Sequence, residues 1–297
     1  IEADNGAYSG HGPTVTLSAA IRSDNLYRYD AVSAAAELVY TNTVPSECFR
    51  GFGYPQATFA QEQLIDELAG RLGIDPVEMR RKNASRTGDK TIHGWQIGSC
   101  GLDLCLDEIS ERMTAHRLTQ EHGCGTGADP LVEGRFRTGY GVAAGIHAIS
   151  SSAYTTGMDL DNVVLTPMAD GSIVVGSGQV ELGCGTVDTM RLIVADALGL
   201  DLESVRVVLG DGRTGPHGLG SFASRTTFFA GQAALIACAE LDARCVVMEE
   251  EMGLSNDAGL KEVIAATAEQ GRLAELAVTA TYAPTTTEAP DGSGYGN

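Results

Sequence analysis

The sequence lacks the patterns that mark several common protein classes. No apolar run in its 297 residues approaches the roughly 18 residues that a membrane span needs. Its seven cysteines include no CxxC pair, so their spacing indicates neither a disulfide framework nor a zinc or iron–sulfur site. We therefore expect reduced thiols and a cytoplasmic location.

Familiar catalytic motifs are missing as well. The histidines form no HExxH pair, no serine stands in a GxSxG context, and neither a GK[ST] phosphate loop nor a GxGxxG fingerprint occurs. Glu47 and Glu181 adjoin glycine-rich turns, where a carboxylate is more often a structural hydrogen-bond acceptor than a general base. Any chemistry is therefore expected to belong to a cofactor.

Basic residues are scarce: 20 Lys and Arg stand against 39 Asp and Glu, a net charge of −19. Nucleic acids and anionic membranes need clustered Lys and Arg, so neither is an expected partner. The same charge opposes any phosphate. A bound phosphate must therefore be held by local backbone dipoles and a few arginines.

Against these absences stand three glycine- or serine-rich segments, each running into a helix-like pattern, at residues 49–56, 180–186 and 221–227. A helix N-terminus offers free N–H groups and a partial positive charge. The second segment alone favours a structural strand–helix turn, and the third alone favours an N-cap beside a surface arginine. In the first, Arg50 lies between Phe49 and Phe52 and can stack on a ring or pair with an anion. Together they indicate a large anionic cofactor.

Hydrophobic periodicity predicts an α+β fold, with mixed sheets and packed helices but no regular βα alternation. A glycine-rich stretch divides it into two domains, residues 1–125 and 126–297. The predicted strands lie at residues 14–17, 36–40, 141–154, 162–180 and 204–209. A hairpin turn at residues 169–172 divides the segment 162–180. The predicted helices lie at 55–72, 75–83, 102–115, 186–198 and 226–252, and the tail from 279 shows no periodicity.

Longer motifs extend the three segments: CFRGFGYPQ at residues 48–56, DELA at 66–69 and RRKN at 80–83. Farther along the chain come VELGCG at 180–185 and ASRT at 223–226. In these motifs the chain resembles the molybdopterin-binding large subunit of the xanthine dehydrogenase and aldehyde oxidase family. These motifs stand in the family's order and cover most of the chain.

The resemblance implies two molybdopterin-binding-type domains and a molybdenum hydroxylase component. Such enzymes hydroxylate, or reductively dehydroxylate, an aromatic, heteroaromatic or aldehyde substrate with oxygen from water. It also implies molybdenum-molybdopterin, with its cytosine dinucleotide form as one option, and a hetero-oligomer with iron–sulfur and FAD subunits. Arg50 and Phe52 would border substrate and metal. The residues expected to bind the cofactor are Phe49, Arg50, Gly51, Leu182, Gly183, Cys184, Ala223, Ser224, Arg225 and Thr226.

Departures from the family pattern set limits on this expectation. Cys184 stands where the family usually has a glutamine whose amide binds the cofactor. Gly51 stands where the carbon monoxide dehydrogenases carry a cysteine, which disfavours that activity. The base glutamate and a further glycine-rich loop are missing, so we expect a fragment or split subunit, incomplete at both ends and inactive alone. Two alternatives stay open: a non-catalytic or assembly subunit, and a generic phosphate-binding α+β domain.

Overall fold

The computed structural model describes residues 1–21, 26–46, 48–92, 94, 96–122, 141–146, 160–213, 215–255 and 258–284. These residues form two compact units, which lie within Ile1–His147 and Ala148–Ala289. The predicted domain boundary between residues 125 and 126 lies outside the described residues. In the part of the chain that is described, no helix has both the length and the apolar character to cross a membrane.

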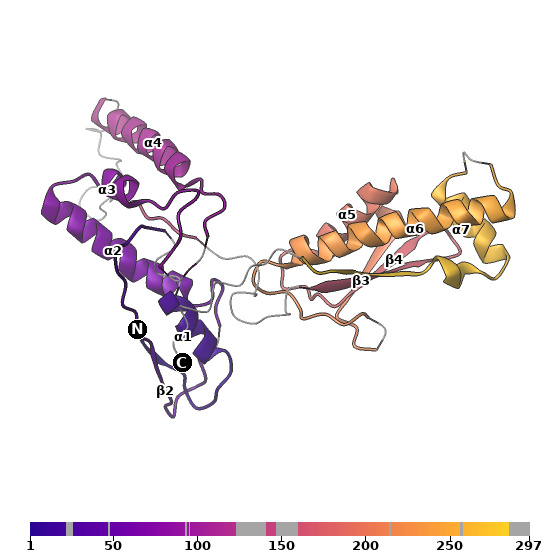
Figure 1. The fold of residues 1–297 in the computed structure, drawn as a ribbon, viewed down its shortest axis with the longest axis horizontal. Helices are drawn as coiled ribbons and strands as arrows, with labels where there is room; N and C mark the ends of the chain where they lie inside the picture. The colour runs from indigo at the N-terminus through magenta and orange to yellow at the C-terminus, as the bar shows by residue number, and fades with distance from the viewer. Residues whose placement is uncertain are drawn as a thin grey trace, which may run out of the picture. The chain divides into compact units, whose positions relative to one another are not determined.

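The first unit is mainly helical. A short parallel pair, β1 (Glu2–Asp4) and β2 (Glu37–Val39), accompanies four helices. The helices are α1 (Gly12–Ile21), α2 (Tyr54–Leu72), α3 (Pro76–Asn83) and α4 (Leu102–His122), as Figure 1 shows. The prediction of helices near 55–72, 75–83 and 102–115 is confirmed, with α4 continuing beyond the predicted end.

Local chemistry sets the ends of α2 and α3. Gly73 closes α2 in the left-handed conformation (φ 65°), which a glycine adopts without steric cost. Asp75 then starts α3, because its carboxylate accepts from the N–H groups of Val77 (2.8 Å) and Glu78 (3.3 Å). Both ends lie where the sequence predicts them.

The predicted strand at residues 14–17 is wrong, because these residues belong to α1. The alternation of β-branched residues suggested a strand. However, Pro13 suits the first turn of a helix, and the buried residues Thr16, Ala19 and Ala20 follow helical spacing. Tertiary packing therefore overrides the local preference.

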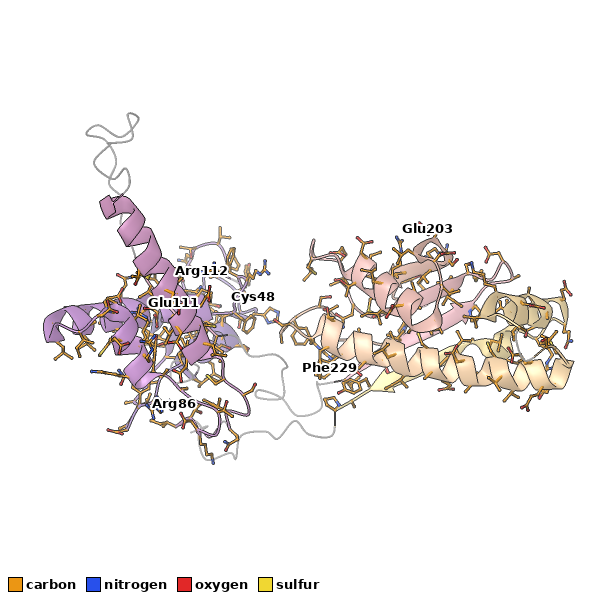
Figure 2. The ribbon with its side chains drawn as sticks, turned by 90° about the horizontal axis from the view of Figure 1, so that it is seen from above. Cys48, Arg86, Glu111, Arg112, Glu203 and Phe229 are labelled. Carbon is orange, nitrogen blue, oxygen red and sulfur yellow. The ribbon has the colours of Figure 1, made fainter. Side chains whose placement is uncertain are left out.

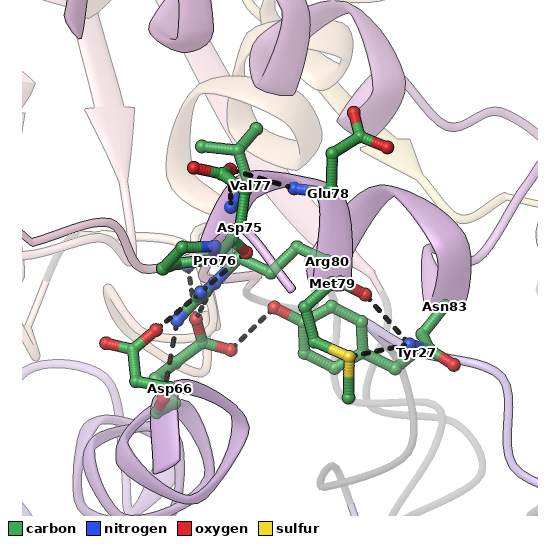
Figure 3. A network of polar contacts seen from close by, with 11 residues as sticks. Tyr27, Asp66, Asp75, Pro76, Val77, Glu78, Met79, Arg80 and Asn83 are labelled. Carbon is green, nitrogen blue, oxygen red and sulfur yellow. Dashed lines mark hydrogen bonds and ion pairs between the residues drawn. The ribbon is translucent and has the colours of Figure 1, made fainter. Parts of the chain in front are cut away.

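A buried ionic network joins α2 to α3 (Figure 3). Arg80 is fully buried; its Nε donates to Glu62 (2.8 Å) and its Nη1 to Asp66 (2.7 Å). The Tyr27 hydroxyl donates to the other Glu62 oxygen (2.7 Å), and Ala144 N–H donates to Glu62 Oε2 (2.8 Å). Burial, and then the bond to Glu62, raises the Tyr27 pKa. Arg80 keeps its charge here because every partner is a carboxylate or a carbonyl.

The second unit is built on a four-stranded mixed sheet in the order β5-β4-β3-β6. Its strands are β3 (Asp161–Pro167), β4 (Ile173–Ser177), β5 (Val205–Leu209) and β6 (Val278–Tyr282). β3 pairs antiparallel with β4 and β6, whereas β4 and β5 run parallel. Alternate residues of β3 and β4 are buried, so one face of the sheet meets the core.

Three helices accompany this sheet: α5 (Thr186–Leu198), α6 (Gly231–Met252) and α7 (Leu260–Glu269). α6 packs on β3 and β6, and α5 packs on β5 (Figure 1). A π-helical turn, Thr226–Ala230, leads into α6, and Phe229 lies at this start of the helix (Figure 2). The α+β prediction is confirmed.

Several predictions for this half of the chain need correction or stay outside the described residues. Residues 141–146 contain no strand, and the rest of the predicted 141–154 strand is not described. Most of β6 lies in the tail from residue 279, for which no strand was predicted. β6 pairs with β3, which lies far away in sequence. α7 was not predicted. The hairpin, α5 and β5 lie where the sequence predicts them.

Candidate functional site

The first glycine-rich segment forms a tight turn before α2 in the first unit. Gly51, Phe52 and Gly53 have φ values of 96°, 53° and 85°. The Phe52 ring lies edge-on to His11, with centroids 6.0 Å apart. Arg50 is exposed and forms no hydrogen bond or ion pair with the residues that are described.

The second segment forms the turn between β4 and α5. The Glu181 carboxylate accepts hydrogen bonds from the N–H groups of Gly183 (2.7 Å), Gly185 (3.1 Å) and Val187 (3.2 Å). These bonds, the one from Val187 first, lower the pKa of Glu181. The carboxylate therefore acts as a structural acceptor, as predicted, and it occupies the N-terminus of α5 where a phosphate was expected.

The outer side of this second turn is open. A Cβ atom on Gly183 or on Gly185 would meet no atom within 4 Å. The Cys184 side chain is exposed, with Sγ 3.3 Å from the Thr186 hydroxyl, and Leu182 is exposed as well. This side of the turn therefore has room for a ligand.

The third segment forms a strained turn before the π-helical turn. Ala223 (φ 49°) and Ser224 (φ 53°) both have the left-handed conformation, which is uncommon for residues other than glycine. The Arg225 N–H donates to the Phe222 carbonyl (3.1 Å), and the Ser224 side chain is exposed. Strained turns of this kind cluster at ligand-binding sites.

Arg225 is fully buried behind this turn, so it is not the surface arginine that the structural alternative required. Its guanidinium lies between the rings of Phe222 (5.1 Å) and Phe229 (5.0 Å) and donates through Nη2 to the Leu160 carbonyl. Among the described residues, Nε and Nη1 have no hydrogen-bond partner. The sequence did not indicate this burial, because Phe229 and Leu160 lie outside the motif.

Gln179 joins the second turn to the third, and sequence reasoning missed it. It is fully buried; its Oε1 accepts from the hydroxyls of Ser221 (2.9 Å) and Thr226 (2.8 Å). Its Nε2 donates to the carboxylate of Asp161, at the start of β3. No local pattern marks a glutamine that acts over such separations.

The structure thus brings together two of the three predicted segments, those of Gly183 and Ser224. Arg50 belongs to the other unit. The prediction that all three segments meet stays a prediction, as do the ligand-binding roles of their residues.

Known protein families account for both halves of the chain. One model of the molybdopterin cofactor-binding domain matches residues 1–84, and a second matches residues 120–295. The chain belongs to the molybdopterin cofactor-binding domain family. The predicted family resemblance is therefore confirmed for most of the chain.

The curated relatives of this chain include a xanthine dehydrogenase subunit and an aldehyde oxidoreductase. The xanthine dehydrogenase molybdenum-binding subunit of Escherichia coli O157:H7 is 32% identical over 85% of this chain and 33% of its own length. The aldehyde oxidoreductase of Megalodesulfovibrio gigas is 29% identical over 82% of this chain and 26% of its own length. The chain therefore spans a third or less of the length of these relatives.

A solved structure confirms the fold. The aldehyde oxidoreductase of Desulfovibrio desulfuricans superposes with a TM-score of 0.73, covering 99% of this chain and 30% of its own. Because the sequence identity is 24%, this similarity shows the fold alone.

The described residues of the second unit fit the planar part of a molybdopterin better than its phosphate. The open faces of Gly183 and Gly185, the Cys184 thiol and the Ser224 hydroxyl are accessible to a flat polar group. The N–H groups at the start of α5 are bound to Glu181, whose negative charge disfavours an anion there. The family's cofactor is thus compatible with these two turns through their exposed sides.

Proposed function

We propose that this chain is the molybdopterin-binding part of an oxidoreductase that hydroxylates, or reductively dehydroxylates, an aromatic, heteroaromatic or aldehyde substrate with oxygen from water. The observation that carries the proposal is the junction at Gln179, which holds two glycine- and serine-rich turns side by side within a molybdopterin-binding domain. The bound cofactor would supply the oxygen-transfer and redox chemistry that the side chains lack.

Two groups of residues have different roles in this proposal. The exposed Leu182, Gly183, Cys184 and Ser224 contact the cofactor, while the buried Arg225 and the half-buried Thr226 hold the third turn from behind. This division refines the sequence-based expectation, in which all of them contact the cofactor. Ala223 contributes through its backbone, because its φ of 49° sets the direction of the turn.

The first turn, which lies in the first unit, is assigned to the substrate. Phe49 and Arg50 are exposed, and Gly51 and Phe52 shape the turn. A guanidinium beside an aromatic ring can hold a polar aromatic or carbonyl substrate through hydrogen bonds and stacking. We assign Arg50 and Phe52 to substrate binding on this ground.

The wider assembly also belongs to the proposal. The relatives include protein subunits, so we infer a hetero-oligomer in which iron–sulfur and FAD subunits remove the electrons. The proposed cofactor can carry a cytosine nucleotide. The six cysteines that the structure describes are free, which supports a reducing, cytoplasmic compartment.

The test is a measurement of molybdenum and pterin. The chain is purified after expression with the gene products encoded beside it; metal analysis and pterin fluorescence give the content per chain. We expect near-stoichiometric amounts of both. A folded chain without molybdenum and pterin contradicts the proposal.

A matched pair of variants locates the binding. Gly183→Val and Gly199→Val both place a side chain at positive φ (86° and 63°) with no atom within 4 Å of the new Cβ. Their backbone strain is therefore similar, but only Gly183 lies in the second turn. We expect Gly183→Val to lose pterin and Gly199→Val to retain it. Equal pterin loss in both would contradict the assigned site.

A second candidate function is a non-catalytic or assembly subunit that keeps the fold. The bonds from Glu181 to the start of α5 favour it, because they fill an anion site with the chain's own carboxylate. This candidate predicts complex formation without bound pterin, so the same content measurement distinguishes the two.

A further inference from the structure

The two hydrogen bonds to Gln179 enclose the strained turn. Ser221 and Thr226 both donate to Gln179 Oε1, at 2.9 and 2.8 Å. Between these two donors lie Ala223 and Ser224, the non-glycine residues with positive φ in the second unit's described part. The amide thus contacts both ends of the segment that holds the strain.

Left-handed backbone at two successive residues with a Cβ is unfavourable, and it persists only where the surroundings enforce it. In an isolated loop, Ala223 and Ser224 would return to negative φ, and the distance between Ser221 and Thr226 would change. A single acceptor atom that binds both hydroxyls opposes this change. Ser221 Oγ adds to the constraint, since it also lies 2.7 Å from the Val180 carbonyl and 3.1 Å from the Val180 N–H.

The orientation of the Gln179 amide is itself determined. Its Nε2 faces the Asp161 carboxylate, which can only accept when ionised, so Oε1 must face the two hydroxyls. The second Asp161 oxygen accepts from the Asn162 N–H at 2.9 Å. A buried network in which each member has a partner specifies a unique geometry.

We propose that Gln179 is a positioning residue that keeps Ala223 and Ser224 in their left-handed conformation. Through this turn Gln179 holds the exposed Ser224 side chain at the cofactor site, a role that rests on the proposed function. Its effect on the backbone of the turn is independent of that function. No pattern in the sequence and no relative's name assigns such a role to Gln179.

Hydrogen–deuterium exchange of the full chain tests the backbone role. Ser221→Ala and Thr226→Val each remove one hydroxyl while Gln179 keeps its bond to Asp161. Thr226→Val loses one bond and should accelerate amide exchange in residues 222–228 about fivefold. Ser221→Ala should accelerate it at least as much, because the Ser221 hydroxyl also contacts Val180. Exchange in β3 and β4 should stay unchanged, because a general loss of stability would raise it there as well.

Thr227→Val is the matched control, since the neighbouring Thr227 is exposed and no hydrogen bond of its hydroxyl is among those described. We expect it to leave exchange unchanged. Gln179→Met removes both bonds and should accelerate exchange more than either hydroxyl variant. It also deprives the Asp161 carboxylate of its amide donor, so the hydroxyl variants decide the test if this chain does not fold.

A rescue variant separates relief of strain from a simple packing defect. Adding Ala223→Gly and Ser224→Gly to Ser221→Ala removes the penalty for positive φ. Exchange should then slow again, by about threefold relative to Ser221→Ala alone. Unchanged exchange in both hydroxyl variants, or faster exchange in the glycine variant, would overturn the positioning role.

Pterin content of the same samples distinguishes the two proposals. If exchange responds as expected while no chain binds pterin, the positioning role stands and the proposed function fails. If the wild type binds pterin but exchange does not respond to the loss of either hydroxyl, the positioning role fails alone.

Discussion

The first turn, residues 49–54, and the third turn, residues 221–226, both hold residues with a Cβ at positive φ, yet different forces stabilise them. In the first turn the cause is steric. A Cβ on Gly53 would lie 2.2 Å from the Val15 carbonyl oxygen, and one on Gly51 would lie 2.4 Å from Pro55 Cγ. These close contacts admit only glycine on either side of Phe52.

In the third turn the cause is polar and aromatic. Gln179 binds both flanking hydroxyls, and Arg225 is stacked between Phe222 and Phe229. Ala223 and Ser224 have no glycine neighbour to relieve the strain. A turn set by sterics is therefore encoded in its own residues, whereas a turn set by hydrogen bonds depends on partners elsewhere in the chain.

The largest effect should come from filling the close contact in the first turn. Gly53→Ala should lower the free energy of unfolding by about 3 kcal/mol, because the new Cβ meets a backbone oxygen that cannot move away. Gly73→Ala should cost only about 1 kcal/mol, since its site is open. Urea unfolding, with exchange protection in α1 and α2, measures both. Equal costs would show that sterics do not set this turn.

Removing the buried arginine of the third turn should have a smaller effect. Arg225→Met loses the stacking on two rings and the bond to the Leu160 carbonyl, about 2 kcal/mol together. Arg225→Lys should cost about 1 kcal/mol, because the charge stays but the planar stack does not. Arg50→Met, at an exposed position in the first turn, should change stability by less than about 0.5 kcal/mol. A comparable loss in Arg50→Met would remove the contrast between the turns.

The buried carboxyl group of Asp161, behind the third turn, should make the stability depend on pH, and this effect is smaller than those above. Burial raises the Asp161 pKa above its ordinary value of 3.8, although the Asn162 N–H, Arg225 and Gln179 oppose the shift. A carboxyl with a raised pKa in the folded state favours folding at low pH, and this contribution is lost as pH rises through that pKa. Stability relative to Asp161→Asn should therefore fall as the pH rises above 3.8, measured by thermal unfolding.

The contribution of Glu181 to the stability of the same unit should depend on pH in the opposite direction. Its backbone hydrogen bonds lower its pKa from 4.5, so its contribution is present above that value and is lost as the pH falls. The advantage of the wild type over Glu181→Gln should thus disappear in acid. Profiles of the same sign for both variants would contradict this account.

The smallest effect on stability is expected at Cys184, on the exposed side of the second turn. Cys184→Gln should change the free energy of unfolding by less than about 0.5 kcal/mol. The amide offers a donor and an acceptor to a ligand, so pterin content under partial loading should rise a few-fold. Cys184→Ser serves as the control of similar size. A lower pterin content in the glutamine variant would contradict the assignment of this side to the cofactor.

Much of the fold could be predicted because its signals are local. Gly73 and Asp75 terminate and start helices with their own atoms, and the turn after Asp170 joins β3 to β4. β6 could not be predicted, since its partner β3 lies more than a hundred residues earlier. Residues 14–17 were misread because a strand-like alternation of β-branched residues lies within a buried helix.

The candidate site divides in the same way. The three glycine- and serine-rich segments and their family were identifiable from their order in the sequence, and the family is confirmed. For Glu181 the sequence predicted only that its carboxylate accepts structural hydrogen bonds, and not that the donors are the N–H groups at the start of α5. The burial of Arg225 and the role of Gln179 had no local signal at all, because their partners come from other elements.

The ends of α2 and α3 and the glycine turns follow from the sequence, because each depends on atoms within a few residues. The family follows from the order of the motifs along the chain. Which buried donors and acceptors meet follows from the packing of distant elements. The hydrogen bonds of Gln179 span 42 residues to Ser221 and 47 to Thr226. Such pairs form only after the sheet and α6 have packed, because burial makes an unpaired polar group costly.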